Sequence, residues 1–171
     1  MSAAQFALTA AAGRGEVWRL WTGHLVHYDA AHLITNAIAV AVPLALADLR
    51  SRRAILLAMT LIAPAISIVL LAAARFDEYR GASGLALAIW VASALSLLQT
   101  ASPRDRMTGA ALLVIAVAKL AAEMFGAGHV WESVAPLPLA HVAGAIAGVI
   151  TFACSTNFSL LQRSVPISIE T

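Results

Sequence analysis

Three small clusters of polar residues interrupt an otherwise apolar sequence, and their side chains are of the types that carry out hydrolysis. They are His32 with Asn36, Ser83 within GASG, and His141 within HVAGAIAG. Each cluster lies at the start of one of three alternate apolar stretches. Polar side chains inside a membrane are costly and usually mark function. Because alternate antiparallel spans begin on the same face of a bilayer, the sequence predicts that the three clusters meet there.

Ser83 is the candidate nucleophile. Gly81 and Gly84 lie on either side of it, and glycine lets the backbone turn tightly and lets a second segment approach the hydroxyl. A helix that starts here would also offer unpaired backbone N–H groups and a positive dipole end to a developing oxyanion. The competing interpretation is a serine that only caps a helix after a turn.

His141 is the candidate general base, because a histidine on a neighbouring helix could take the serine proton. Gly144 and Gly148 follow it in a small-xxx-small pattern, which permits close helix contact in lipid. The alternative is a histidine with a purely structural hydrogen bond. No Asp or Glu on an odd-numbered span is placed to orient His141, so the sequence favours a two-residue Ser–His mechanism.

His32 and Asn36 are four residues apart and therefore share a helix face. Both can donate hydrogen bonds to an oxyanion, where one lost donor typically costs about 2.7–4 kcal/mol. The alternatives are hydrogen bonds between helices, or metal ligation together with His24 and His27. No Cys or carboxylate pattern completes a metal site, and we expect neither a metal nor a cofactor.

Lys119 and Glu123 form a charged pair four residues apart within the fourth apolar stretch. The simpler interpretation is that the two charges neutralise each other, with the lysine extended toward polar surroundings. The alternative is that the pair binds a polar element of a substrate.

The elements that must position these residues are membrane spans. Hydrophobic residues make up 61% of the 171-residue chain and charged residues only 12%, against about 25% charged in soluble proteins. A hydrocarbon core of about 30 Å needs roughly 20 apolar residues per helix. The sequence thus predicts an all-α, polytopic transmembrane helix bundle in a single domain, 1–171, with five spans at about 32–47, 54–74, 83–99, 107–125 and 135–154.

The segments between the spans predict the orientation of the chain in the membrane. Residues 13–31 are expected to form an interfacial loop, and residues 155–171 a cytoplasmic tail. Six arginines follow the odd-numbered spans and four lie in the opposite loops, which favours a cytoplasmic C-terminus and places the polar clusters near the outer face. The basic residues are scattered between spans and do not indicate nucleic-acid binding.

The order of these motifs resembles that of the rhomboid intramembrane serine proteases. WRLWTGHLVHYDAAHLITN, GASG and AHVAGAIAG follow one another across residues 18–150. The resemblance implies that Ser83 is the nucleophile, that His141 is the base, and that His32 and Asn36 support the oxyanion. His27 is expected to be structural. The family core has six helices, and residues 1–17 are too short to supply the one that normally precedes the WR-containing loop. We therefore expect the first helix to be missing, either because the start of the sequence is truncated or misplaced or because the protein has a five-span form.

The small size, TGHLVH, the Lys119/Glu123 pair and VAPLPLAHVAG resemble the rhombosortase branch in particular. That branch implies substrates anchored in a bacterial inner membrane by a C-terminal tail: a Gly-rich motif, a hydrophobic helix and a basic cluster. Cleavage on the periplasmic side would release the substrate, by hydrolysis or by transfer to another acceptor. The expected partners are such proteins and the lipid bilayer, with no nucleic acid.

Two other functions compete with proteolysis. A rhomboid-like pseudoprotease would bind transmembrane segments without cleaving them, but all four expected polar residues are present. A small polytopic transporter would use buried polar pairs along its pathway, but the sequence lacks the repeated broken helices of that class.

Overall fold

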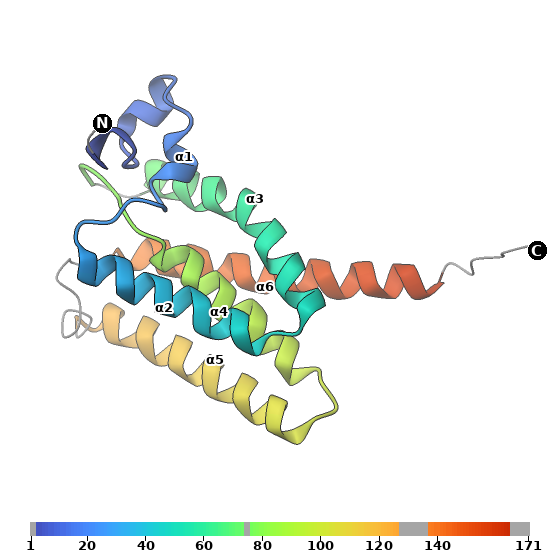
Figure 1. Ribbon diagram of the computed structural model, residues 1–171. Helices are drawn as coiled ribbons and strands as arrows, with labels where there is room; N and C mark the ends of the chain where they lie inside the picture. The colour runs from blue at the N-terminus through green and yellow to red at the C-terminus, as the bar shows by residue number, and fades with distance from the viewer. Residues whose placement is uncertain (1–2, 74–75, 127–136, 165–171) are drawn as a thin grey trace, which may run out of the picture.

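The computed structural model is a helical bundle, and it describes residues 3–73, 76–126 and 137–164. Within these ranges the main helices are α2 (Ala30–Leu46), α3 (Leu49–Ala73), α4 (Ser83–Leu98), α5 (Pro103–Met124) and α6 (Pro138–Ser164). They run back and forth between the two ends of the molecule (Figure 1). The described residues contain no strand, only one isolated bridge between Leu8 and Tyr79. The predicted all-α membrane bundle is confirmed.

Capping residues fix where several helices begin. Asp29 precedes α2, and its carboxylate accepts a hydrogen bond from the His32 backbone N–H at 2.7 Å. Ser102 caps α5 in the same way, followed by Pro103 in the first turn, a position where the missing N–H of proline costs nothing. The Asp29 cap therefore fixes where the helix that carries His32 and Asn36 begins.

The helices fall into two groups by length. Among the described residues, three helices are long and apolar enough to cross a membrane: Ser51–Ala73, Pro103–Met124 and Pro138–Thr156. The apolar helices α2 and α4 are shorter. The helix α6 continues to Ser164, beyond the predicted end of the last span at 154, so the first part of the predicted tail is helical. The predicted start of that span at 135 lies outside the described residues.

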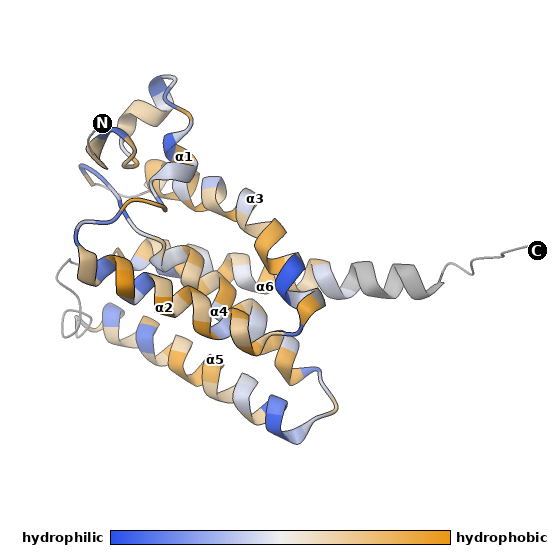
Figure 2. Cartoon of the chain, viewed as in Figure 1, coloured by the Kyte–Doolittle hydropathy of each residue, from blue (hydrophilic) through white to orange (hydrophobic). Residues whose placement is uncertain are grey.

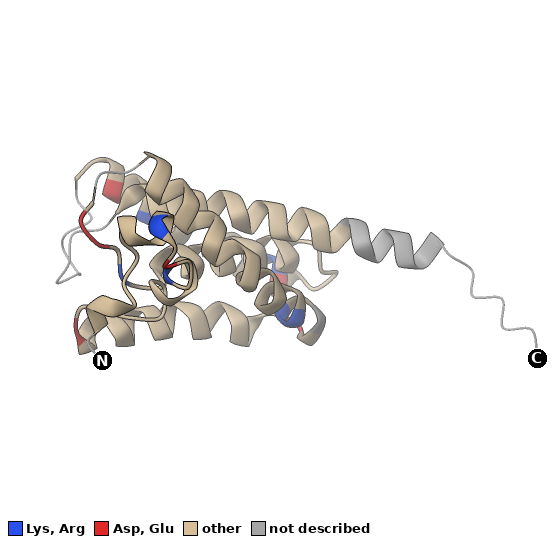
Figure 3. Ribbon diagram, turned by 90° about the horizontal axis from the view of Figure 1, so that it is seen from above, with Lys and Arg blue, Asp and Glu red and all other residues tan. Residues whose placement is uncertain are grey.

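The outside of the bundle is suited to lipid. Charged residues gather toward the two ends of the helices, with an uncharged zone between them (Figure 3), and apolar residues cover the helices in that zone (Figure 2). Many large apolar side chains are exposed there, including Leu57, Leu61, Val114 and Val117. An apolar surface this extensive would be unstable in water and indicates a multi-pass membrane protein.

Helix α4 lies at the centre of the bundle. It contacts α2, α3, α5 and α6, most extensively α6, and ten of its sixteen residues are buried. Glycines bring α6 close: a Cβ atom on Gly144 would overlap the Gly84 carbonyl oxygen, and one on Gly148 would lie 2.5 Å from the Ala88 carbonyl oxygen. The close helix contact predicted from the small-xxx-small pattern is confirmed.

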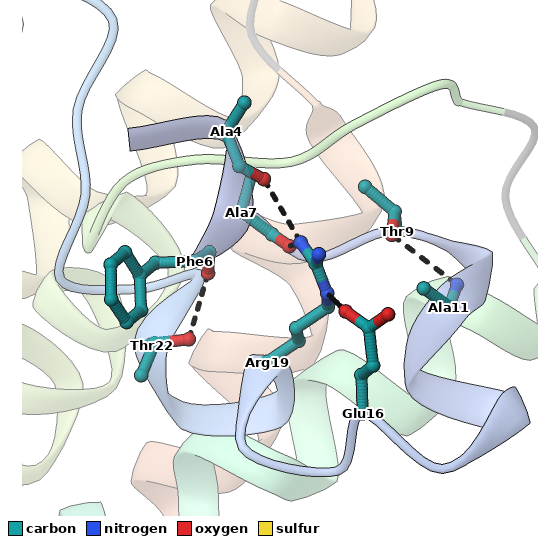
Figure 4. A network of polar contacts seen from close by, with 8 residues as sticks. All are labelled: Ala4, Phe6, Ala7, Thr9, Ala11, Glu16, Arg19 and Thr22. Carbon is teal, nitrogen blue, oxygen red and sulfur yellow. Dashed lines mark hydrogen bonds and ion pairs between the residues drawn. The ribbon is translucent and has the colours of Figure 1, made fainter. Parts of the chain in front are cut away.

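The N-terminal segment folds over one end of the bundle, around Arg19 at the start of the short helix α1 (Arg19–Thr22). The Arg19 guanidinium pairs with Glu16 at 2.5 Å and donates to the carbonyl oxygens of Ala4 and Ala7 at 2.9 and 2.7 Å (Figure 4). The Trp21 indole N–H donates to the Thr60 carbonyl oxygen of α3 at 2.8 Å. The region expected to be an interfacial loop is thus folded and attached to α3.

This segment also holds the loop that leads into α4. Leu8 and Tyr79 exchange two backbone hydrogen bonds, of 3.0 and 2.9 Å, and the Gly81 N–H donates to the Gly23 carbonyl oxygen at 3.0 Å. These bonds fix the chain on the N-terminal side of Ser83. The first residue of α4 is therefore positioned by contacts from a distant part of the sequence.

Candidate active site

Ser83 lies at the start of α4, beside the contact between α4 and α6. The preceding turn uses Gly81 at φ +115°, a conformation that side chains disfavour. Gly84 packs so tightly on α6 that a Cβ atom there would lie 2.8 Å from the Ala140 carbonyl oxygen. Since Ser83 precedes Gly84 and His141 follows Ala140, the two predicted catalytic residues flank one close helix contact.

Ser83 also lines a cavity of about 170 Å³ between α2, α4 and α5. Its polar lining residues are Ser83, Asn36, Thr35 and Lys119, and the apolar ones are Ala39, Ala86, Leu87, Trp90, Ile115 and Ala116. The Trp90 indole N–H donates to the Ala39 carbonyl oxygen at 2.6 Å and ties α4 to α2 at this wall. The cavity can hold a small side chain next to the serine.

His32 and Asn36 pack against the turn before Ser83. A Cβ atom on Gly81 would lie 2.6 Å from His32 Cε1 and 3.3 Å from Asn36 Nδ2. The Asn36 side chain is buried, and its Nδ2 group has no hydrogen-bond partner among the described residues. The His27 ring meets the His32 ring edge-on, with centroids 5.1 Å apart, as suits the structural role expected for His27. The two residues predicted to stabilise an oxyanion thus lie together near the serine.

His141 is completely enclosed and has a carboxylate partner. Its Nδ1 atom lies 2.5 Å from Glu123 Oε2, and both side chains are only 1% exposed. Its other ring nitrogen, Nε2, is buried with no hydrogen-bond partner among the described residues. Glu123 Oε1 lies 2.9 Å from Lys119 Nζ. One imidazole nitrogen is therefore occupied and the other is available.

The Glu123 contact corrects two sequence-based interpretations. The sequence predicts no carboxylate beside His141 because no odd-numbered span carries one in a suitable place, whereas the structure places Glu123, on the fourth span α5, against the His141 ring. The reason for expecting a Ser–His pair without a carboxylate partner therefore no longer holds. Lys119 and Glu123 do more than neutralise each other, because Glu123 also binds His141. Of the two residues, only Lys119 lines the cavity, so direct substrate contact by Glu123 is not supported.

The sequence matches the Rhomboid domain family over residues 14–157. The chain belongs to the rhomboid family. The matched region includes every polar residue of the site described above. A search of curated proteins finds no match to this chain.

Tyr79 is a residue of this rhomboid site that sequence analysis missed. Its side chain is buried in the loop before Ser83. Burial raises the pKa of the Tyr79 phenol to about 12, against a smaller lowering by the nearby Ser83 hydroxyl. The phenol therefore stays protonated next to the serine. Only its position four residues before Ser83 could have drawn attention to it.

His24 anchors the first loop of the rhomboid domain. Its Nε2–H group lies 3.0 Å from both the Ala63 carbonyl oxygen and Ser67 Oγ, and Ser67 donates to the Leu20 carbonyl oxygen. Burial lowers the pKa of His24 to about 4, so the ring is neutral near pH 7. Among the described residues, no group of three or more His, Cys, Asp or Glu side chains is placed to hold a metal ion.

Proposed function

We propose that this rhomboid is an intramembrane serine endopeptidase with Ser83 as nucleophile and His141 as general base. One observation carries the proposal. Ser83 opens α4 on the wall of a cavity, beside the α4–α6 contact that carries His141, whose Nε2 atom is buried and has no hydrogen-bond partner within residues 3–73, 76–126 and 137–164. A buried imidazole nitrogen with an available lone pair is what a serine hydroxyl needs to become a nucleophile.

The chemistry follows the general serine-hydrolase scheme. Ser83 Oγ attacks the scissile carbonyl carbon while His141 Nε2 takes the hydroxyl proton. The peptide C–N bond then breaks, the proton passes from His141 to the leaving nitrogen, and the substrate remains attached to Ser83 as an ester. Water attacks this ester with His141 again as base, which releases the new carboxyl end and restores the serine.

The oxyanion formed in each step would be stabilised by donors around the cavity. Asn36 Nδ2 supplies N–H groups with no other partner among the described residues, and the first backbone N–H groups of α4 have no acceptor within the helix. The His32 ring, packed on Gly81, is the third candidate donor. Donors held in place before the reaction are effective because they need no rearrangement as charge develops.

The proposed substrates are proteins anchored by a C-terminal transmembrane helix, cut at a Gly-rich motif beside it. The cavity of about 170 Å³ favours small residues at the cleavage site. The distribution of arginines supports a site on the outer side of the membrane, which in the rhombosortase branch is the periplasmic side of a bacterial inner membrane. Cleavage there would free the substrate from its anchor, as in the rhombosortase branch that the sequence resembles.

The test is cleavage of such an anchored reporter in proteoliposomes. We expect wild type to release the reporter by a cut within its Gly-rich motif and Ser83→Ala to release none. Ser96→Ala is the control, because Ser96 also lies on α4 but donates to the Ala92 carbonyl oxygen. Wild type that binds the reporter without cutting it, alongside no reaction with serine-directed probes, would support a pseudoprotease instead.

A further inference from the structure

The geometry points to Glu123 as a positioning residue for the proposed reaction. We infer that its carboxylate holds the His141 ring in the tautomer and orientation that activate Ser83, so that the site works as Ser83–His141–Glu123. This inference rests on the proposed proteolytic function. It adds a third residue, Glu123 on α5, to the Ser–His pair of the family.

The contact with Glu123 determines which ring nitrogen of His141 carries the proton. An ionised carboxylate can only accept hydrogen bonds. At 2.5 Å from Glu123 Oε2, His141 Nδ1 must therefore carry the hydrogen. The neutral ring then has its lone pair on Nε2, the nitrogen that is buried and has no partner among the described residues. The carboxylate thus selects the tautomer that a general base requires.

A lysine beside it favours the ionised form of the buried Glu123 carboxylate. Its Oε1 atom lies 2.9 Å from Lys119 Nζ, and an adjacent cation favours the charged form of a carboxylate. The Lys119 side chain is 39% exposed and lines the cavity, so its ammonium group is less enclosed than the Glu123 carboxylate. With one oxygen on Lys119 and the other on His141, the carboxylate is fixed in orientation as well as in charge.

The proposed reaction places a positive charge on His141. When His141 takes the Ser83 proton it becomes an imidazolium, and its side chain is only 1% exposed. A buried cation without a partner is strongly disfavoured. Glu123 already lies against the ring and compensates this charge as it appears, which lowers the barrier.

A purely structural pair predicts a different outcome for substitution. If Lys119 and Glu123 only neutralise each other, replacing both by uncharged residues of similar size preserves activity, because buried pairs are often replaceable without loss of stability. If Glu123 positions His141, the double variant folds but does not react.

The experiment uses the full chain in proteoliposomes and measures the rate of Ser83 labelling by a fluorophosphonate. Glu123→Gln keeps the shape but removes the charge, and we expect labelling to fall at least about 100-fold, since loss of the triad carboxylate in other serine proteases costs about 10⁴ in kcat. Lys119→Met with Glu123→Gln should be equally slow, with an unchanged Tm. Glu123→Asp should recover part of the rate.

Glu16→Gln is the matched control, because it makes the same change in an ion pair of the N-terminal segment, with Arg19; it should label like wild type. A second readout needs no variant. In wild type labelled with ¹⁵N-histidine, the ring shifts of His141 should show protonated Nδ1 and unprotonated Nε2.

Three results would overturn the inference. One is labelling of the folded Glu123→Gln or double variant within threefold of wild type. Another is an Nε2-protonated His141 in wild type. Either of these leaves the proposed function intact if wild type is labelled at Ser83 and Ser83→Ala is not. The third is wild type that is not labelled at Ser83, which removes the proposed function and this inference with it.

Discussion

His141, in the first turn of α6, and Glu123, in the last turn of α5, form a buried hydrogen bond of 2.5 Å. The two helices run in opposite directions, so the end of one meets the start of the other at the same face of the bundle (Figure 1). Ser83 and the turn of α2 that carries Asn36 lie at this face as well, around one cavity. All the polar groups proposed for the reaction thus come together at one end of the bundle.

Removing an oxyanion donor should slow the reaction without abolishing it. Asn36→Ala and His32→Ala are each expected to lower kcat by about 10²–10³, the usual cost of one lost donor. Residual activity should remain because the serine, the base and the other donors are intact. The measurement is single-turnover cleavage of the anchored reporter. Asn36→Ala with full activity would exclude that residue from oxyanion binding.

Gly81→Ala should reduce both stability and activity, through strain in the backbone and through a clash with the His32 ring. A matched variant can separate these two effects. The residue has φ +115° and a Cβ atom there would lie 2.6 Å from the His32 ring. Gly15 has nearly the same conformation, φ +112°, but open space around it. In Gly15→Ala the strained backbone conformation alone should lower the free energy of unfolding, by about 1–3 kcal/mol. Turnover should be normal.

The measurements for these two variants are the free energy of unfolding and the rate of reporter cleavage. Gly81→Ala should lose more stability than Gly15→Ala and should also lose activity, because His32 and Asn36 must move. Equal effects at the two glycines would show that close packing of the His32 ring on Gly81 is unimportant.

Stability should decrease in acid because of His24. Its pKa is about 4 in the folded chain, against about 6.5 in an unfolded one. Between these values the unfolded state binds more protons, so stability falls as pH falls from about 6.5 to 4, by up to about 3 kcal/mol. We expect the Tm of wild type in detergent to drop over this range, and that of His24→Gln to change much less. A Tm of wild type that is constant over the range would contradict the assignment.

Most of the site could be predicted from the sequence because its residues lie in short local motifs. Ser83 between two glycines, the His32/Asn36 pair and His141 before Gly144 each require only helix periodicity and antiparallel alternation of spans. The Glu123 contact could not be predicted in that way. It depends on the rotation of α5 about its axis, which is set by packing against α4, where Gly109 approaches the Ala94 carbonyl oxygen.

The fold was predictable to a similar extent. Hydropathy indicated an all-α membrane bundle, but it could not distinguish the long helices from the shorter α2 and α4, because burial inside a bundle and exposure to lipid favour the same apolar residues. Residues 13–31 were expected to form an interfacial loop, but the folding of that loop could not be predicted in detail. It depends on single long-range bonds, such as those of Arg19 to Ala4 and Ala7, which have no periodic pattern in the sequence.

The central claim is that His141 activates Ser83, and the rate of fluorophosphonate labelling with mapping of the adduct tests it most directly. We predict a single adduct on Ser83 in wild type, none in Ser83→Ala, and labelling at least about 100-fold slower in His141→Ala, since the two residues act as one unit. Ser96→Ala should label at the wild-type rate. Wild type that is not labelled at Ser83, or His141→Ala that labels as fast as wild type, would contradict the claim.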